Sequence, residues 1–175
     1  MSEHAVLAAS ASKRWLTCPP SARLEESMPK STSAFAEEGR LAHRIGEIKL
    51  MLHFGNEPVP IQPEHSEEME DYVDEYVSFI LDLHKQNPDQ IVRIEQQFDL
   101  KDYIPGGFGT SDYSAVNSEV LDVVDLKYGK GVFVKVENNP QFMIYALGAY
   151  QLYGWAYEPK VVRMHVVQPR IDNIN

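Results

Sequence analysis

The chain has 175 residues with 43% hydrophobic content, which predicts a single globular domain over residues 1–175 with one core. The single cysteine, Cys18, excludes an internal disulfide, and neither a secretory leader nor a membrane span is evident, so we expect a soluble, cytoplasmic protein. The net charge of −10 disfavours binding to phosphates, yet eight acids between Glu64 and Asp82 account for most of that charge.

An N-terminal segment, residues 1–30, precedes the predicted core. A short helix is predicted around Ser10–Leu16, and Cys18-Pro19-Pro20 should end it because two prolines cannot continue a helix. The pattern leaves the function of Trp15 and Cys18 open, and packing against the core is the simpler interpretation.

A longer helix is predicted over Ala34–Phe54, with Thr32 or Ser33 as its N-cap. Its main apolar stripe is predicted to consist of Leu41, Ile45, Ile48 and Leu52.

His43 falls on the opposite side of this helix, in line with Gly39 and Gly46, which allow another element to approach closely. An inward-facing imidazole is therefore expected. Two interpretations remain open at this point, a hydrogen-bonded core histidine and a metal ligand.

The acidic segment 64–86 is predicted to be a helix inserted into the core order, with an apolar inner face and acids on its outer face. A solvated helix that covers the core explains this pattern. A surface that mimics DNA or binds a basic partner is the alternative. The predicted inner face consists of Met69, Tyr72, Val73, Tyr76, Val77, Ile80 and Leu83.

Strand-like segments and one more helix follow. The Pro105-Gly106-Gly107 turn and Asn117-Ser118 separate three strands that should form a meander. The fold class is therefore α/β (α+β), a mixed β-sheet flanked by helices in the order α-β-β-β-α-β, with the acidic helix inserted. The predicted elements are strands at Ile91–Leu100, Phe108–Val116 and Glu119–Tyr128, a helix at Gln141–Trp155 and a strand at Lys160–Gln168.

Charged residues interrupt the apolar strands at Asp112, Asp125 and Lys127. Burying such charges costs several kcal/mol (about 2–7 for an uncompensated polar group) unless a partner or a metal compensates. Two carboxylates on neighbouring strands with a lysine suit metal-dependent phosphodiester cleavage. A salt-bridged hairpin would produce the same pattern, so the spacing alone leaves both interpretations open.

Four motifs occur in one order along the chain: Glu38–His43, Gly109–Asp112, Val124–Gly131 and Gln141–Tyr145. With the opening segment Ser10–Pro19, they resemble the PD-(D/E)XK nuclease superfamily, specifically its RecB-like branch and related phage and prophage proteins. The resemblance covers nearly the whole chain and implies a restriction-endonuclease-like core.

The resemblance also implies roles for individual residues. Asp112, Asp125 and Lys127 would be catalytic. A Mg²⁺ or Mn²⁺ ion would be held by His43, Asp112, Asp125 and the backbone carbonyl of Leu126.

Further residues would support this centre. Gln141 and Tyr145, one helical turn apart, would contact DNA or brace the site. Glu47 is a candidate outer partner of the centre, and Glu95 is a weaker candidate ligand. An iron–sulfur cluster, which several RecB-like nucleases hold with four cysteines, is excluded because only Cys18 is present.

The leading functional hypothesis is a metal-dependent deoxyribonuclease, an exonuclease or DNA-processing enzyme of phage recombination or genome metabolism in a bacterial host. Its partners would be DNA and, in addition, an accessory phage recombination protein or a second copy of the chain. The alternatives are a catalytically inactive nuclease-fold binding or assembly module and an acidic DNA-mimic inhibitor.

Overall fold

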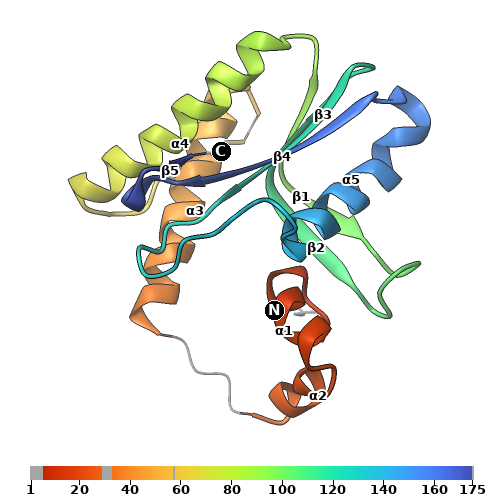
Figure 1. Cartoon of the computed structure of the whole chain (residues 1–175). Helices are drawn as coiled ribbons and strands as arrows, with labels where there is room; N and C mark the ends of the chain where they lie inside the picture. Colours follow the sequence, from red (N-terminus) through yellow and green to blue (C-terminus); the bar gives the residue numbers. More distant parts are fainter. Residues whose placement is uncertain (1–5, 29–32, 57, 175) are drawn as a thin grey trace.

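The computed structural model describes residues 6–28, 33–56 and 58–174. These residues form a mixed α+β fold in which helices flank a five-stranded mixed sheet (Figure 1), as the sequence predicts at this level. In spatial order the sheet contains β1 (Ile91–Asp99), β2 (Phe108–Val116), β3 (Val120–Leu126), β4 (Val161–Gln168) and β5 (Asn173–Ile174).

The strands combine two kinds of pairing. β1, β2 and β3 form the predicted antiparallel meander, β4 runs parallel to β3, and β5 is antiparallel to β4. The parallel pair is connected through a helix, as a parallel crossover requires. β3 is buried along its whole length because helices cover both faces of the sheet at this strand.

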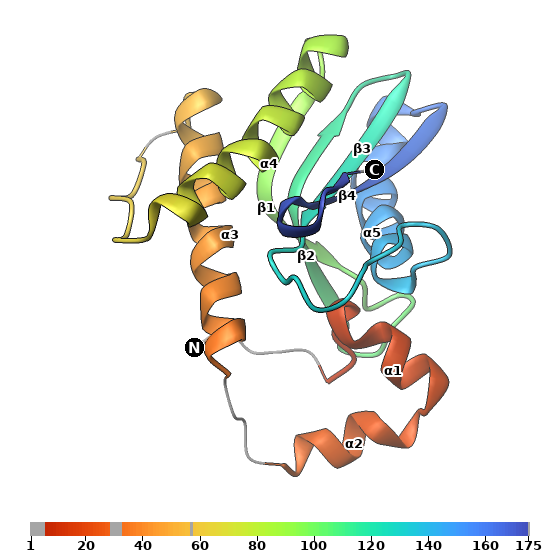
Figure 2. The same ribbon diagram turned by 60° about the vertical axis from the view of Figure 1, so that its left-hand side comes forward.

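Helices occupy both faces of the sheet. α3 (Ala34–His53) and α4 (Glu67–Gln86) lie on one face, and α5 (Pro140–Tyr157) lies on the other (Figures 1 and 2). The short helix α1 (Ser12–Thr17) lies near the start of α5, and α2 (Pro20–Glu26) follows it farther from the sheet (Figure 2).

Each face has its own apolar cluster. On the first face, α3 and α4 pack against inward residues of β2 and β3 such as Tyr113 and Val124. On the second face, Phe98 and Leu121 pack against α5. α5 lies close to the sheet because Gly148 carries no Cβ; an added Cβ would lie 2.7 Å from that of Phe98.

The helix starts follow local capping rules. Ser33 accepts a hydrogen bond from Ala36 N, and Ser66 accepts one from Met69 N. Ser33 is therefore the cap of α3, as predicted, whereas the other predicted cap, Thr32, lies outside the described residues. The inserted helix begins at Glu67 rather than at residue 64, because Ser66 is its cap.

The predicted helix faces are only partly correct. The inner face of α4 is confirmed, with Tyr72 at its half-buried edge. On α3, Leu52 is exposed while Gly46 and Leu50 are buried, because this helix packs on α4 as well as on the sheet. In the described part of the chain, no helix is both long enough and apolar enough to cross a membrane.

Candidate metal centre

The centre forms where β2 and β3 separate. Their ladder runs from Val116↔Leu121 to Tyr113↔Val124 and then stops. Beyond this point the Asp112 carboxylate occupies the space between the strands, and its Oδ2 accepts a hydrogen bond of 2.6 Å from Leu126 N. This bond satisfies a buried N–H that the ladder leaves unpaired and fixes the direction of the carboxylate.

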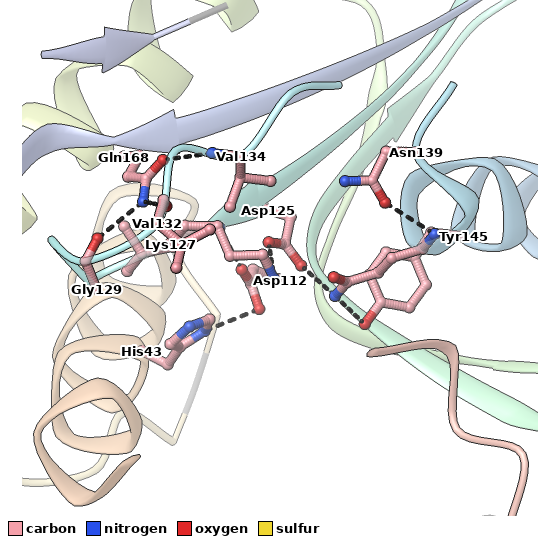
Figure 3. A network of polar contacts seen from close by, with 12 residues as sticks. His43, Asp112, Asp125, Lys127, Gly129, Val132, Val134, Asn139, Tyr145 and Gln168 are labelled. Carbon is pink, nitrogen blue, oxygen red and sulfur yellow. Dashed lines mark hydrogen bonds and ion pairs between the residues drawn. The ribbon is translucent and has the colours of Figure 1, made fainter. Parts of the chain in front are cut away.

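His43 reaches the same carboxylate from α3. Its Nδ1 lies 3.0 Å from Asp112 Oδ1, and its side chain is partly exposed rather than enclosed in the core (Figure 3). Histidine and aspartate, which are 69 positions apart in the sequence, thus meet at one end of the sheet.

Glu95 of β1 completes this group. Among the described residues, the ligand atoms of His43, Glu95 and Asp112 all lie within 4.8 Å of one another, so these three side chains could hold a metal ion. The flanking pairs Ile94↔Tyr113 and Gln96↔Ser111 bring Glu95 across from Asp112, which explains how the two carboxylates come together.

The backbone of Glu95 is in the left-handed region, with φ of 49°. This conformation costs a residue with a Cβ roughly 1–3 kcal/mol. The regular β1–β2 pairing is interrupted at this position, between Ile94↔Tyr113 and Gln96↔Ser111. Strain of this kind is concentrated at functional sites, where the surrounding structure maintains it.

Asp125 and Lys127 form the second half of the centre. Lys127 Nζ lies 2.6 Å from Asp125 Oδ2, and among the described residues this ion pair is the polar contact of that buried oxygen. Asp125 is not a member of the three-residue group, although its charge acts on His43. The structure therefore places the predicted acids side by side, with Asp112 facing His43 and Asp125 facing Lys127.

Gln141 and Tyr145 extend from α5 toward Asp125. Gln141 Nε2 donates to Asp125 Oδ1 at 3.3 Å and to the Tyr145 hydroxyl at 3.0 Å, and both side chains are buried. Asn139 caps α5 by accepting from Gln141 N at 3.0 Å, which fixes the start of the helix (Figure 3). Gly109 makes room for the Tyr145 ring, since an added Cβ would lie 2.8 Å from it.

The charges of the centre shift one another's pKa values. Burial raises the pKa of Glu95 to about 8, with a further contribution from Asp112. Burial disfavours the charged form of His43, but Asp112, Asp125 and Glu95 outweigh it and raise the pKa of His43 to about 9. Burial and the neighbouring Asp112 raise the pKa of Asp125, against the opposing effect of Lys127.

Burial likewise favours the protonated form of Asp112, but His43 and the Leu126 N–H outweigh it and lower its pKa. Three acids thus share a poorly solvated volume. A divalent cation would stabilise their charged forms together, and carboxylate oxygens are the donors that hard cations prefer. The donor set therefore fits an ion.

Glu95, the weaker candidate from the sequence, belongs to the group that could hold an ion. Glu47 is ion-paired with Arg44 at 2.5 Å and its charge helps to raise the pKa of Glu95, so its role as an outer partner stays a prediction. The signal for Glu95 was an acid in the middle of a strand, but only the register of β1 against β2 sets it opposite Asp112. The Leu126 backbone enters the site through its N–H, and a role for its carbonyl stays a prediction.

A family model matches residues 4–175, nearly the whole chain. The chain belongs to the DUF2800 family. This family is described as "Protein of unknown function", so membership names no activity. A solved structure described as "Crystal structure of SSO0001" is similar to this DUF2800 chain at 12% identity, covering 87% of this chain and 69% of its own, with a TM-score of 0.28. A likeness this weak carries no argument.

Proposed function

We propose that the protein is a metal-dependent deoxyribonuclease of the PD-(D/E)XK type, RecB-like branch. The observation that carries the proposal is the convergence of His43, Glu95 and Asp112 beside the Asp125–Lys127 ion pair. The order of α3, the β1–β3 meander, α5 and β4 supports a restriction-endonuclease-like core.

The proposed ligands of a Mg²⁺ or Mn²⁺ ion are His43, Asp112 and Asp125, with Glu95 and the Leu126 carbonyl as further donors. Carboxylates and carbonyls suit both ions, and an imidazole favours Mn²⁺ over Mg²⁺. When bound, the ion supplies Lewis-acid polarisation of a phosphoryl oxygen and lowers the pKa of a water molecule.

The remaining residues of the centre would position the reacting groups and stabilise developing charge. Lys127, held by Asp125, is placed to orient the attacking water or to stabilise charge that develops on the phosphate. Gln141 holds Asp125 from the opposite side, and the Tyr145 hydroxyl holds Gln141. Because Gln141 and Tyr145 are buried, bracing explains their geometry better than direct contact with DNA does.

The test is cleavage of linear single- and double-stranded DNA with Mg²⁺ or Mn²⁺. We expect Lys127→Ala to lower the rate by about 100-fold or more, as does removal of one preorganised electrostatic group in other enzymes. Asp112→Asn should have a similar or larger effect. Lys101→Ala is the matched control, because Lys101 is an exposed lysine paired only locally with Asp99.

Inactive wild-type protein, or variants that cleave as well as the wild type, would contradict the proposal. The alternative, a non-catalytic module with the same fold, is favoured by the net charge of −10. Calorimetric metal titration separates the two, because a module with a decayed site shows no ion binding that depends on Asp112 and Asp125. The DNA-mimic alternative has less support, because Lys49 neutralises part of the acidic helix by pairing with Glu70 and Asp74.

A further inference from the structure

A cleft of about 570 Å³ opens beside the metal centre, between the first half of α3 and the loop that follows β3. His43 and Lys127 are among the residues that line it, so it is continuous with the candidate centre. The rest of its lining is mostly apolar or aromatic and includes Phe35, Tyr128 and Val132. The volume is within the range of small-molecule sites.

The loop after β3, which forms one wall of this cleft, is held in place by hydrogen bonds before any ligand binds. Gln168, a buried residue of β4, donates to Gly129 O and Val132 O at 2.8 Å each and accepts from Val134 N at 3.1 Å (Figure 3). A loop held by three hydrogen bonds to one side chain needs little further ordering when a ligand binds.

The cleft presents rings at two depths. Tyr128 is buried, and the guanidinium of Arg170 lies over its ring at 4.7 Å while Arg170 also pairs with Glu38 at 3.0 Å. Phe35, in the first turn of α3, is 80% exposed at the rim. An exposed ring by itself is ordinary. Here it lies at the entrance of an apolar cleft that ends at the metal centre.

A second cleft, of about 590 Å³, lies on the other side of the same loop and has a different character. Lys13, Lys127 and Lys135 line it, together with Glu137. Lys127 belongs to both clefts, so a basic channel and an apolar one meet at the candidate catalytic lysine.

We propose that the apolar cleft binds an unpaired nucleobase, and that the substrate is therefore single-stranded DNA or a frayed end. This inference rests on the proposed action on DNA. The base stacks on Phe35, its phosphate lies at Lys127 and the metal centre, and the chain continues through the basic cleft. A base in a duplex would first have to leave its stack and its partner, whereas an unpaired base enters at no such cost.

The charge of the protein agrees with recognition by stacking. Four lysines line the two clefts (Lys13, Lys127, Lys130 and Lys135), which predicts a slope of log affinity against log salt of only about −3 for a single strand. Base–aromatic stacking is less sensitive to salt and supplies affinity that an acidic protein cannot obtain from phosphates.

The test measures binding by fluorescence anisotropy in EDTA, where cleavage cannot occur. The probes are a labelled oligothymidylate and the same strand annealed to its complement. We expect the single strand to bind at least about tenfold more tightly than the duplex, and Phe35→Ala to weaken single-strand binding about tenfold. Phe35→Tyr, which keeps a ring, should stay within about twofold of the wild type, since stacking accepts any aromatic face.

Trp155→Ala is the matched control, because Trp155 is 82% exposed on α5 and lines neither cleft. Its binding should equal that of the wild type. Equal affinity for single strand and duplex, or equal affinity of the Phe35→Ala and Trp155→Ala variants for the single strand, would overturn the inference.

A separate measurement distinguishes this failure from failure of the proposed function. Mn²⁺-dependent hydrolysis of bis(p-nitrophenyl) phosphate by the wild type reports the chemistry without any base. Hydrolysis without single-strand preference overturns the base cleft and leaves the nuclease proposal standing. Single-strand preference that depends on Phe35, without hydrolysis of this diester or of DNA, supports the base cleft and overturns the nuclease proposal.

Discussion

Two buried aspartates lie three positions apart on β3, and their surroundings differ. Asp122 is 0% exposed and Asp125 is 2% exposed. Asp122 accepts from Arg163 Nε and Nη2 at 2.7 and 2.9 Å, from His165 Nε2 at 3.0 Å and from Gln90 Nε2 at 2.8 Å. Asp125 has one hydrogen bond of 3.3 Å, from Gln141, and the ion pair with Lys127.

This difference separates an acid with a structural role from the acid that we propose as a metal ligand. Both oxygens of Asp122 are saturated by a bidentate guanidinium, an imidazole and an amide, so nothing is left for a ligand. Asp125 has fewer partners, with Oδ2 facing the single ammonium of Lys127 and Oδ1 accepting one long hydrogen bond, and it lies close enough to Asp112 and Glu95 for their charges to interact. Burial alone therefore does not distinguish the two acids, whereas the number of partners does.

The largest predicted effect compares the same substitution at both positions. Asp122→Asn should lower the free energy of unfolding by about 3 kcal/mol, because the buried side chain loses its charge-assisted hydrogen bonds from Arg163 and His165. Asp125→Asn, measured in EDTA, should change stability by less than about 1 kcal/mol, because the loss of the Lys127 ion pair is offset by removal of the repulsion from Asp112. Urea unfolding followed by circular dichroism measures both. Equal losses at the two positions would remove the distinction between them.

Stabilisation by a bound metal ion should depend on the acids of the candidate centre and not on Asp122. Mn²⁺ at about 100 times its dissociation constant stabilises a protein by about 2.7 kcal/mol. For a chain of this size that raises the thermal midpoint by roughly 5–10 °C. Asp112→Asn should abolish the increment, whereas Asp122→Asn should retain it on a lower baseline. A Mn²⁺ increment that survives in Asp112→Asn would place the ion elsewhere.

Acid should weaken the contacts of Asp122 with Arg163, His165 and Gln90. This effect is smaller than that of Asp122→Asn, because protonation removes only the part of those contacts that depends on charge. Burial favours protonated Asp122, but His165, Arg163 and Gln90 outweigh it and lower its pKa in the folded state. A lowered folded pKa contributes stability that is complete above the unfolded value of about 4 and is lost as the pH falls from there through the folded pKa. The other group facing Asp122 is the buried Tyr113 hydroxyl, whose pKa burial and Asp122 raise.

The difference in unfolding free energy between the wild type and Asp122→Asn should therefore shrink below about pH 4. Urea titrations at a series of pH values measure it. A difference that stays constant down to the lowest pH would show that the charge of Asp122 does not contribute.

The smallest effect concerns the strained backbone. Glu95→Gly should raise stability in EDTA by about 1 kcal/mol, because glycine adopts a positive φ without the Cβ penalty. Glu158→Gly is the matched control, since Glu158 has a φ of 47° at the end of α5 and is exposed. Both variants should be stabilised, but only Glu95→Gly should lose part of the Mn²⁺ increment. Destabilisation by Glu95→Gly alone would show that its side chain supports the fold.

The sequence by itself determined the elements and most of the candidate residues. Residue periodicity located α3, α4 and the meander, because burial of one helix face or alternate strand positions leaves a direct trace in the sequence. Charges within apolar strands singled out Asp112, Asp125 and Lys127 for a related reason, since such charges need compensation wherever they are buried.

Only the tertiary structure decided which acids act together. Asp122 drew no attention in the sequence because its partners Arg163 and His165 are about forty residues away and reach it through the parallel pairing of β3 with β4. Glu95 joins Asp112 through strand register, and Asp112 is available because β2 and β3 separate. Register and strand separation depend on the packing of the whole sheet, which no local pattern encodes.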